Sequence, residues 1–123
     1  MLFSLLLSII NLAMGITAKN NKSMRDLINV RNSRYVIMTR DGKRGRRYLF
    51  QKGKYSSDKI LTDYDMALVF VDADAGFKTL ALGGPTGIME AINNWKLKVA
   101  GDATIMNFFT IMIGVSMGMV KRN

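Results

Sequence analysis

The stretch WKLKVAGDATIMNFFTIMIGVSMG, residues 95–118, decides the fold of this chain. Its first part alternates between apolar and charged residues, with Leu97 and Val99 on one side and two lysines on the other. Alternation with a period of two is typical of a strand that buries one face. We therefore predict a strand over residues 95–101.

A long apolar helix is predicted directly after this strand. Gly101 interrupts the alternation, and Asp102 is a favourable N-cap residue. Residues 103–120 carry no charge, and their Met, Phe, Ile and Val side chains form two adjacent rows on a helix. A helix over 102–120 has no charged face to turn to water, so a sheet, another helix, a lipid-like ligand or a bilayer must cover it.

The composition limits the chemistry open to the chain. It has 123 residues, ten of them Met, and contains neither His nor Cys. This length predicts a single domain, 1–123, with a core of its own. Without His or Cys, the most common metal ligands, nucleophiles and near-neutral acid/base groups are missing. We therefore expect a protein that is not an enzyme, with no metal and no cofactor, and the lack of disulfides fits a cytoplasmic location.

The positive charge is concentrated in one third of the chain. Between Lys19 and Lys59 there are thirteen Lys or Arg against three Asp, a local charge of +10, while the whole chain carries +9. Such a region attracts polyanions, either the phosphates of a nucleic acid or an anionic membrane surface. The sequence therefore allows peripheral attachment to a membrane.

The first 18 residues, Met1 to Ala18, are uncharged and predict a helix. A signal peptide would begin with basic residues, and a membrane span needs about 20 apolar residues with fewer polar interruptions. We expect a helix that packs inside the fold or against a partner, including a second copy in a homodimer. A rival interpretation makes this run and 103–120 two short spans of a membrane-embedded protein or subunit, but the strand and turn signals between them favour a soluble domain.

The middle of the chain predicts strands and then short helices. A weak helical pattern continues to residue 32, so 1–32 would form the N-terminal helices. Residues 33–71 hold a hairpin and further strands, with turns at Asp41-Gly42 and Lys52-Gly53. Residues 72–94 hold two helices separated by Gly83-Gly84.

The order of these elements resembles the sterol carrier protein 2 (SCP2) family. Lys96 to Val99, Gly101-Asp102 and the apolar helix resemble that family's last strand, Gly-Asp corner and closing helix, and the resemblance covers residues 34–118. Met66 to Val71 followed by Asp72 resembles its strand before two short helices. The resemblance implies an α/β (α+β) fold, a five-stranded mostly antiparallel sheet covered by helices that enclose an apolar tunnel. It also implies binding of a sterol, fatty acyl chain or phospholipid without chemical change.

Two sets of residues are the candidate binding residues. Those for the lipid are Phe77, Leu80, Ile88, Ile92, Met106, Phe109, Met112 and Ile113. Those for an anionic head group or membrane are Lys43, Arg44, Arg46, Arg47, Lys52 and Lys54. Flexible, polarizable Met side chains suit an adaptable apolar wall, although a Met and Phe stripe at helical spacing is also typical of an ordinary core.

Three other features admit a functional interpretation. The basic hairpin of residues 40–54 contains Tyr48 and Phe50, so nucleic-acid binding is an alternative function, which we rank below a hairpin whose aromatic residues face inward. Asp63 and Asp65 precede a predicted strand while Asp72 follows it, which argues against one metal or acid/base site. Trp95 could anchor the protein at a membrane or cover the tunnel, but at the start of a strand we expect it to be buried.

Overall fold

The computed structural model describes residues 2–20, 32–51, 54–83, 86–106, 109–110 and 113. For residues 17–20 it describes the backbone only. Five strands form one sheet in the order β3-β2-β1-β4-β5. They are β1 (Ser33–Thr39), β2 (Gly45–Gln51), β3 (Lys54–Asp58), β4 (Met66–Phe70) and β5 (Leu97–Gly101). β1 and β4 pair parallel, and the other three pairs are antiparallel. The predicted α+β fold with a mostly antiparallel five-stranded sheet is therefore confirmed.

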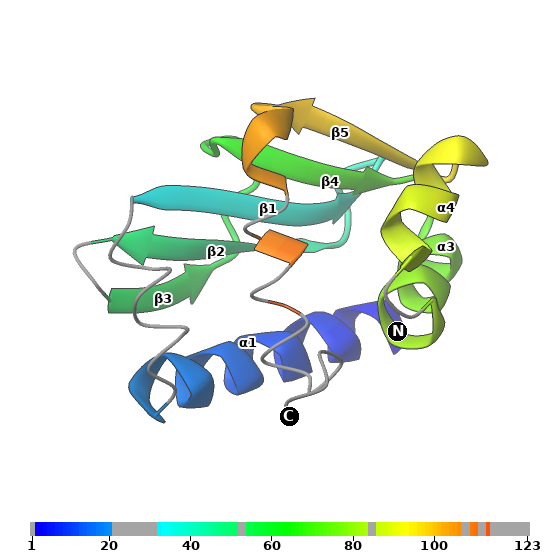
Figure 1. Ribbon diagram of the computed structural model, residues 1–123. Coiled ribbons are helices and arrows are strands. Elements are labelled where there is room, and N and C mark those ends of the chain that lie inside the picture. Colours follow the sequence, from blue (N-terminus) through cyan, green and yellow to red (C-terminus); the bar gives the residue numbers. More distant parts are fainter. Residues whose placement is uncertain are drawn as a thin grey trace.

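Helices lie on one face of this sheet and at one of its ends (Figure 1). The first is α1 (Leu2–Asn20), which runs along the sheet. The others are α3 (Ala73–Phe77), the π-helix η1 (Lys78–Leu82), α4 (Gly87–Asn93) and the short 3-10 helix η3 (Ala103–Ile105). The predicted helix from Asp72 to Leu82 is thus present, but its hydrogen bonding widens at Lys78.

Two predicted helices fall partly or wholly outside the described residues. The first is the second N-terminal helix, predicted within residues 19–32. Residues 19–20 belong to α1, and residues 21–31 lie outside the described part of the chain. The closing helix over 102–120 is described only to residue 113, where Met106, Phe109, Thr110 and Ile113 are helical. The hydroxyl of Thr110 donates to the carbonyl of Met106 at 2.9 Å, a contact typical of one helical turn.

The core lies between the sheet and α1. The buried side chains of α1 are Phe3, Leu6, Leu7, Ile10 and Met14. They pack against every second residue of the central strands, including Tyr35, Tyr48 and Phe70. Because side chains alternate along a strand, the residues between these face the opposite side of the sheet.

That opposite face is crossed by the connection from β3 to β4. β3 lies at one edge of the sheet and β4 lies beyond β1, so residues 59–65 must pass over β2 and β1. We call residues 59–65 the crossover strap. Val36 and Ala67, whose side chains alternate onto this face of the sheet, are fully buried.

The outer side of α1 is also apolar. Leu2, Leu5, Ile9, Leu12 and Ile16 are each between 43% and 66% exposed, and they follow one another at spacings of three and four residues. A helix normally turns polar residues to water, so the outer side of α1 is a large exposed apolar stripe. Within the described parts of the chain, no helix combines the length and apolarity that crossing a bilayer requires.

Candidate functional site

An aromatic cluster occupies the centre of the layer between the sheet and α1. The ring of Phe109 stacks on Tyr35 with 4.4 Å between centroids and lies 5.7 Å from the ring of Tyr48. Phe50 contacts the edge of Tyr35 at 5.7 Å. The sequence identified Phe109 as a candidate and predicted that Tyr48 faces inward, but it did not identify Tyr35, because a tyrosine in a strand has no pattern of its own that distinguishes a site from a sheet interior.

The described candidate lipid-binding residues lie in or against this apolar layer. Leu80, Phe109 and Ile113 belong to the buried core cluster. Phe77, Ile88, Ile92 and Met106 are half-buried and pack against that cluster. Met112 lies outside the described residues. The fold thus brings residues from α3, η1, α4 and the closing helix to one side of the sheet.

Two tyrosine hydroxyls fasten α1 to the sheet. Tyr48 donates a hydrogen bond of 3.0 Å to the carbonyl of Leu7, and Tyr55 donates one of 2.6 Å to Oδ1 of Asn11. Burial raises the pKa of both phenols, so both keep the proton that they donate. Polar contacts of this kind fix α1 over the sheet in one position.

The basic candidate residues of the hairpin differ in how exposed they are and in how far they bind other parts of the fold. Lys43, Arg44 and Lys54 are exposed, and Lys52 lies outside the described residues. Arg46 is half-buried and donates to the hydroxyl of Ser57 at 3.0 Å. As predicted, Tyr48 and Phe50 face inward, so the described hairpin offers neither ring to a nucleobase.

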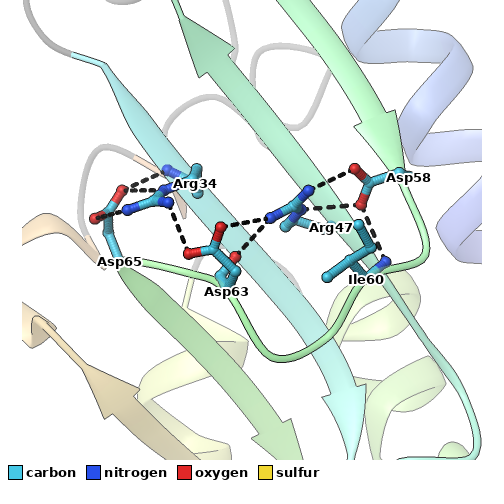
Figure 2. Close-up of polar contacts among 6 residues, drawn as sticks. All are labelled: Arg34, Arg47, Asp58, Ile60, Asp63 and Asp65. Carbon is cyan, nitrogen blue, oxygen red and sulfur yellow. Dashed lines mark hydrogen bonds and ion pairs between the residues drawn. The ribbon is translucent and has the colours of Figure 1, made fainter.

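Arg47 is engaged more completely than the other basic residues (Figure 2). Its guanidinium group donates to Asp58 at 2.6 and 2.9 Å and to the Asp63 carbonyl at 2.9 Å, and its side chain is only 9% exposed. Hydrogen bonding with Asp58 raises the pKa of Arg47 and lowers that of Asp58. A buried, paired arginine cannot reach a head group, and we therefore leave Arg47 out of the proposed anionic site.

The acidic residues before β4 bind the strap to the sheet. Asp63 lies between two arginines, and Arg34 donates to it at 2.7 Å and to Asp65 at 3.2 Å (Figure 2). A hydrogen bond with Asp65 raises the pKa of Arg34. Asp72 lies beyond the other end of β4, where it accepts from the N–H of Ala75 at 2.8 Å and caps α3. The acidic residues are thus divided between two ends of β4, as predicted.

Trp95 lies beside a groove at the edge of the sheet, and the prediction that it is buried is wrong. Its side chain is 88% exposed, because residue 95 belongs to the turn after α4 and the strand begins only at Leu97. The groove has a volume of about 650 Å³. Its lining residues are Arg40, Val69, Ile92, Trp95, Lys96, Leu97, Lys98, Val99 and Ala100. The sequence identified Trp95 and allowed it an interfacial role, but the strand-like alternation that begins there favoured burial.

Comparisons with known proteins support the same fold at low sequence identity. The sequence matches no protein-family model and no curated protein. The structure is similar to "UbiJ-SCP2 Ubiquinone synthesis protein", with a TM-score of 0.68, 11% identity, and coverage of 91% of this chain and 96% of that one. It is also similar to "Sterol Carrier Protein 2 from Yarrowia Lipolytica (apo form)", with a TM-score of 0.58, 14% identity, and coverage of 92% and 90%. The resemblance in the sequence is thereby confirmed for the fold: this chain forms an SCP2-like domain.

Proposed function

We propose that this protein binds one lipid, a sterol, a fatty acyl chain or a phospholipid, between its sheet and its helices and transfers it unchanged between membranes. The observation that carries the proposal is the fold, which is similar to a structure named as a sterol carrier protein over nine tenths of both chains. A lipid would be held by loss of contact with water, worth about 25 cal/mol for each Å² of apolar surface buried.

The residues proposed to line this lipid site are those whose positions in the layer are compatible with contact. Four half-buried residues would contact the ligand directly: Phe77, Ile88, Ile92 and Met106. The wall behind them would be formed by three buried residues: Leu80, Phe109 and Ile113. We also include Met112 from the sequence pattern. Flexible thioethers among aromatic rings would adapt to lipids of different shape.

Placing a charged side chain in the apolar layer between the sheet and the helices tests the proposed lipid site. Met106→Lys should weaken binding of a fluorescent fatty acid at least tenfold, because lipid entry would have to desolvate an ammonium group. Ile60→Lys places the same charge on the crossover strap, on the opposite face of the sheet, and should leave binding unchanged. Native mass spectrometry of protein purified without added lipid should show a co-purified lipid. Wild-type protein that carries no co-purified lipid and takes up no fatty acid, sterol or phospholipid would refute the proposal.

We further propose that accessible hairpin cations bring the protein to anionic membranes. Lys43, Arg44 and Lys54 are exposed, and Lys52 joins them by its place in the sequence. Each lysine or arginine near such a surface contributes about 1 kcal/mol. Arg46 is given a smaller part, because it is half-buried against Ser57.

A second copy of the chain is the proposed partner of α1. The exposed stripe from Leu2 to Ile16 repeats every seven residues with spacings of three and four, which is the pattern of a helix that packs against another helix. Leu2, Ile9 and Ile16 form one row, and Leu5 and Leu12 form the other. A homodimer would remove these side chains from water.

A further inference from the structure

Trp95 occupies a backbone position that normally belongs to glycine. Its φ is +62°, in the left-handed region, where the Cβ of an L-residue crowds the following carbonyl. The position is fixed by the C-terminus of α4: the Trp95 N–H donates to Ile92 at 3.2 Å, and the Lys96 N–H donates to Ala91 at 2.9 Å. This pair of bonds is a Schellman motif, and its left-handed residue is most often glycine because glycine has no Cβ.

Packing of the Trp95 side chain within the fold does little to offset this strain. Residue Trp95 is 88% exposed, so it keeps most of its contact with water when the chain folds. Strained residues that do not improve packing are concentrated where a protein meets something else. The strain at Trp95 is therefore better explained by a contact with another molecule than by packing within the chain.

The surroundings of Trp95 indicate the chemistry of that contact. The groove beside it has an apolar surface formed by Val69, Ile92 and β5, and its described lining residues include three cations, Arg40, Lys96 and Lys98, and no acid. All three cations are exposed, and none of them takes part in an ion pair among the described residues. Strand register places Lys98 opposite Val69, on the face of the sheet that turns away from α1.

An apolar groove, a protruding indole and three unpaired cations together match the interface of an anionic bilayer. Tryptophan is enriched at the head-group level, where its ring is partly in hydrocarbon and its N–H reaches water. Lysine and arginine beside it would attract anionic head groups. A single-stranded nucleic acid would need several exposed rings for its successive bases, but Tyr48 and Phe50 of the neighbouring hairpin are buried.

We propose that Trp95, Arg40, Lys96 and Lys98 form a docking surface for an anionic lipid bilayer, with the indole inserted at the head-group level. This inference rests on the proposed lipid-carrier function and adds, to the hairpin cations proposed to attract the protein to a membrane, the surface at which a side chain enters the bilayer. Ile92 lines the groove and also packs against the core cluster, so the docked surface adjoins the candidate lipid layer. A lipid leaving the bilayer at this place would have a short way to the candidate binding residues.

The chain contains its own probe for this surface, because Trp95 is its only tryptophan. Vesicles of equal parts phosphatidylglycerol and phosphatidylcholine should shift the Trp95 emission to the blue, and brominated acyl chains should quench it. Vesicles of phosphatidylcholine alone should have little effect, and the shift should weaken as salt is raised, because salt screens exposed charges.

Two sets of variants separate docking from folding. Trp95→Gly should lower the vesicle partition coefficient about tenfold or more, since it removes the inserted ring, yet raise Tm by roughly 3–5 °C by relieving the left-handed strain. Arg40→Gln and Lys98→Gln should each lower partitioning about fivefold. Lys59→Gln is the matched control, since it lies just after β3, about 19 Å across the sheet from β5 at ~4.8 Å per strand, and it should change partitioning less than twofold.

Several results would overturn this inference while leaving the carrier function standing. One is vesicle binding with unchanged Trp95 emission, which would place the contact on another surface. Another is a Trp95→Gly variant with a lowered Tm, which would make Trp95 a structural residue. A larger emission change with a single-stranded oligonucleotide than with anionic vesicles would favour nucleic acid instead. Fatty-acid binding, measured in parallel, should be the same in Trp95→Gly as in wild type, so loss of the carrier function would be seen separately.

Discussion

Gly101 combines a left-handed backbone with a close approach to a neighbouring strand, so a side chain there is poorly tolerated. It ends β5 with a φ of +77°, and a Cβ there would overlap the carbonyl oxygen of Asp65 at the start of β4. Gly101→Ala should therefore lower the free energy of unfolding by about 2–4 kcal/mol, from backbone strain plus displacement of β4. Urea unfolding followed by circular dichroism measures the loss.

Gly42 provides a matched control for this prediction. It also has a positive φ, +72°, but nothing lies within 4 Å of where its Cβ would be. Gly42→Ala should therefore cost only the strain, about 1–2 kcal/mol. Equal losses for the two variants would mean that Asp65 moves aside easily and that the contact at Gly101 is unimportant.

At the scale of elements, the crossover strap depends on carboxylates that hold two arginines. Asp58→Asn should lower the free energy of unfolding by about 1–3 kcal/mol at pH 7, because Arg47 loses an ionised partner in a buried position. The folded pKa of Asp58 lies below its usual value of about 3.9. Its contribution is therefore complete above pH ~5, where the carboxyl is ionised in the unfolded chain as well, and is lost as the pH falls through the folded pKa.

The difference between wild type and Asp58→Asn should accordingly shrink as the pH is lowered from 5 to about 2.5. Urea midpoints for both proteins across this range measure it. Lys59→Gln, a substitution of an exposed neighbour, should leave the midpoint within about 0.5 kcal/mol of wild type at every pH. A difference that stays constant with pH would mean that Asp58 acts through its shape and not its charge.

The strap also shows where prediction from the sequence ends. The strands predicted over residues 66–71 and 95–101 are present as β4 and β5 with slightly shorter bounds, and the turn at Asp41-Gly42 and the Gly-Asp corner were also predictable, because each is encoded by local residues. The parallel pairing of β1 with β4 was not, because it depends on contacts between segments about thirty residues apart. Arg47 was likewise assigned to an exposed basic patch, because its partners come from other segments: Asp58 by the pairing of β3 with β2, and Asp63 by the strap.

The residues of the candidate site were also predictable from the sequence only in part. Helical spacing was enough to identify residues such as Leu80 and Phe109, which now lie in one core cluster. It could not identify Tyr35, whose part in the cluster comes from stacking on Phe109 across the layer. Nor could it foresee the exposure of Trp95, since the alternation that begins there is typical of a strand, whereas the hydrogen bonds that end α4 keep residue 95 out of it.

At the scale of the whole molecule, two opposing terms act on the proposed homodimer. The exposed stripe of α1 favours association, and a helix of 19 residues is about 28 Å long at ~1.5 Å per residue, enough for a contact of moderate area. A charge of +9 on each chain opposes it. Raising the salt concentration from 50 to 300 mM should therefore strengthen the dimer, whereas it should weaken attachment to anionic membranes.

Sedimentation velocity at both salt concentrations checks this prediction, with a Kd expected in about the micromolar range for a contact of this size. Leu5→Glu with Leu12→Glu should leave only monomer, because both carboxylates would be buried at the contact, while the exposed Ile60→Glu should not alter the equilibrium. Since the chain has no cysteine, Ile9→Cys offers a single thiol at the middle of the stripe, and mild oxidation should yield a disulfide-linked dimer. Monomer at every salt concentration, with no cross-link from Ile9→Cys, would mean that the stripe serves some other contact than a second copy of this chain.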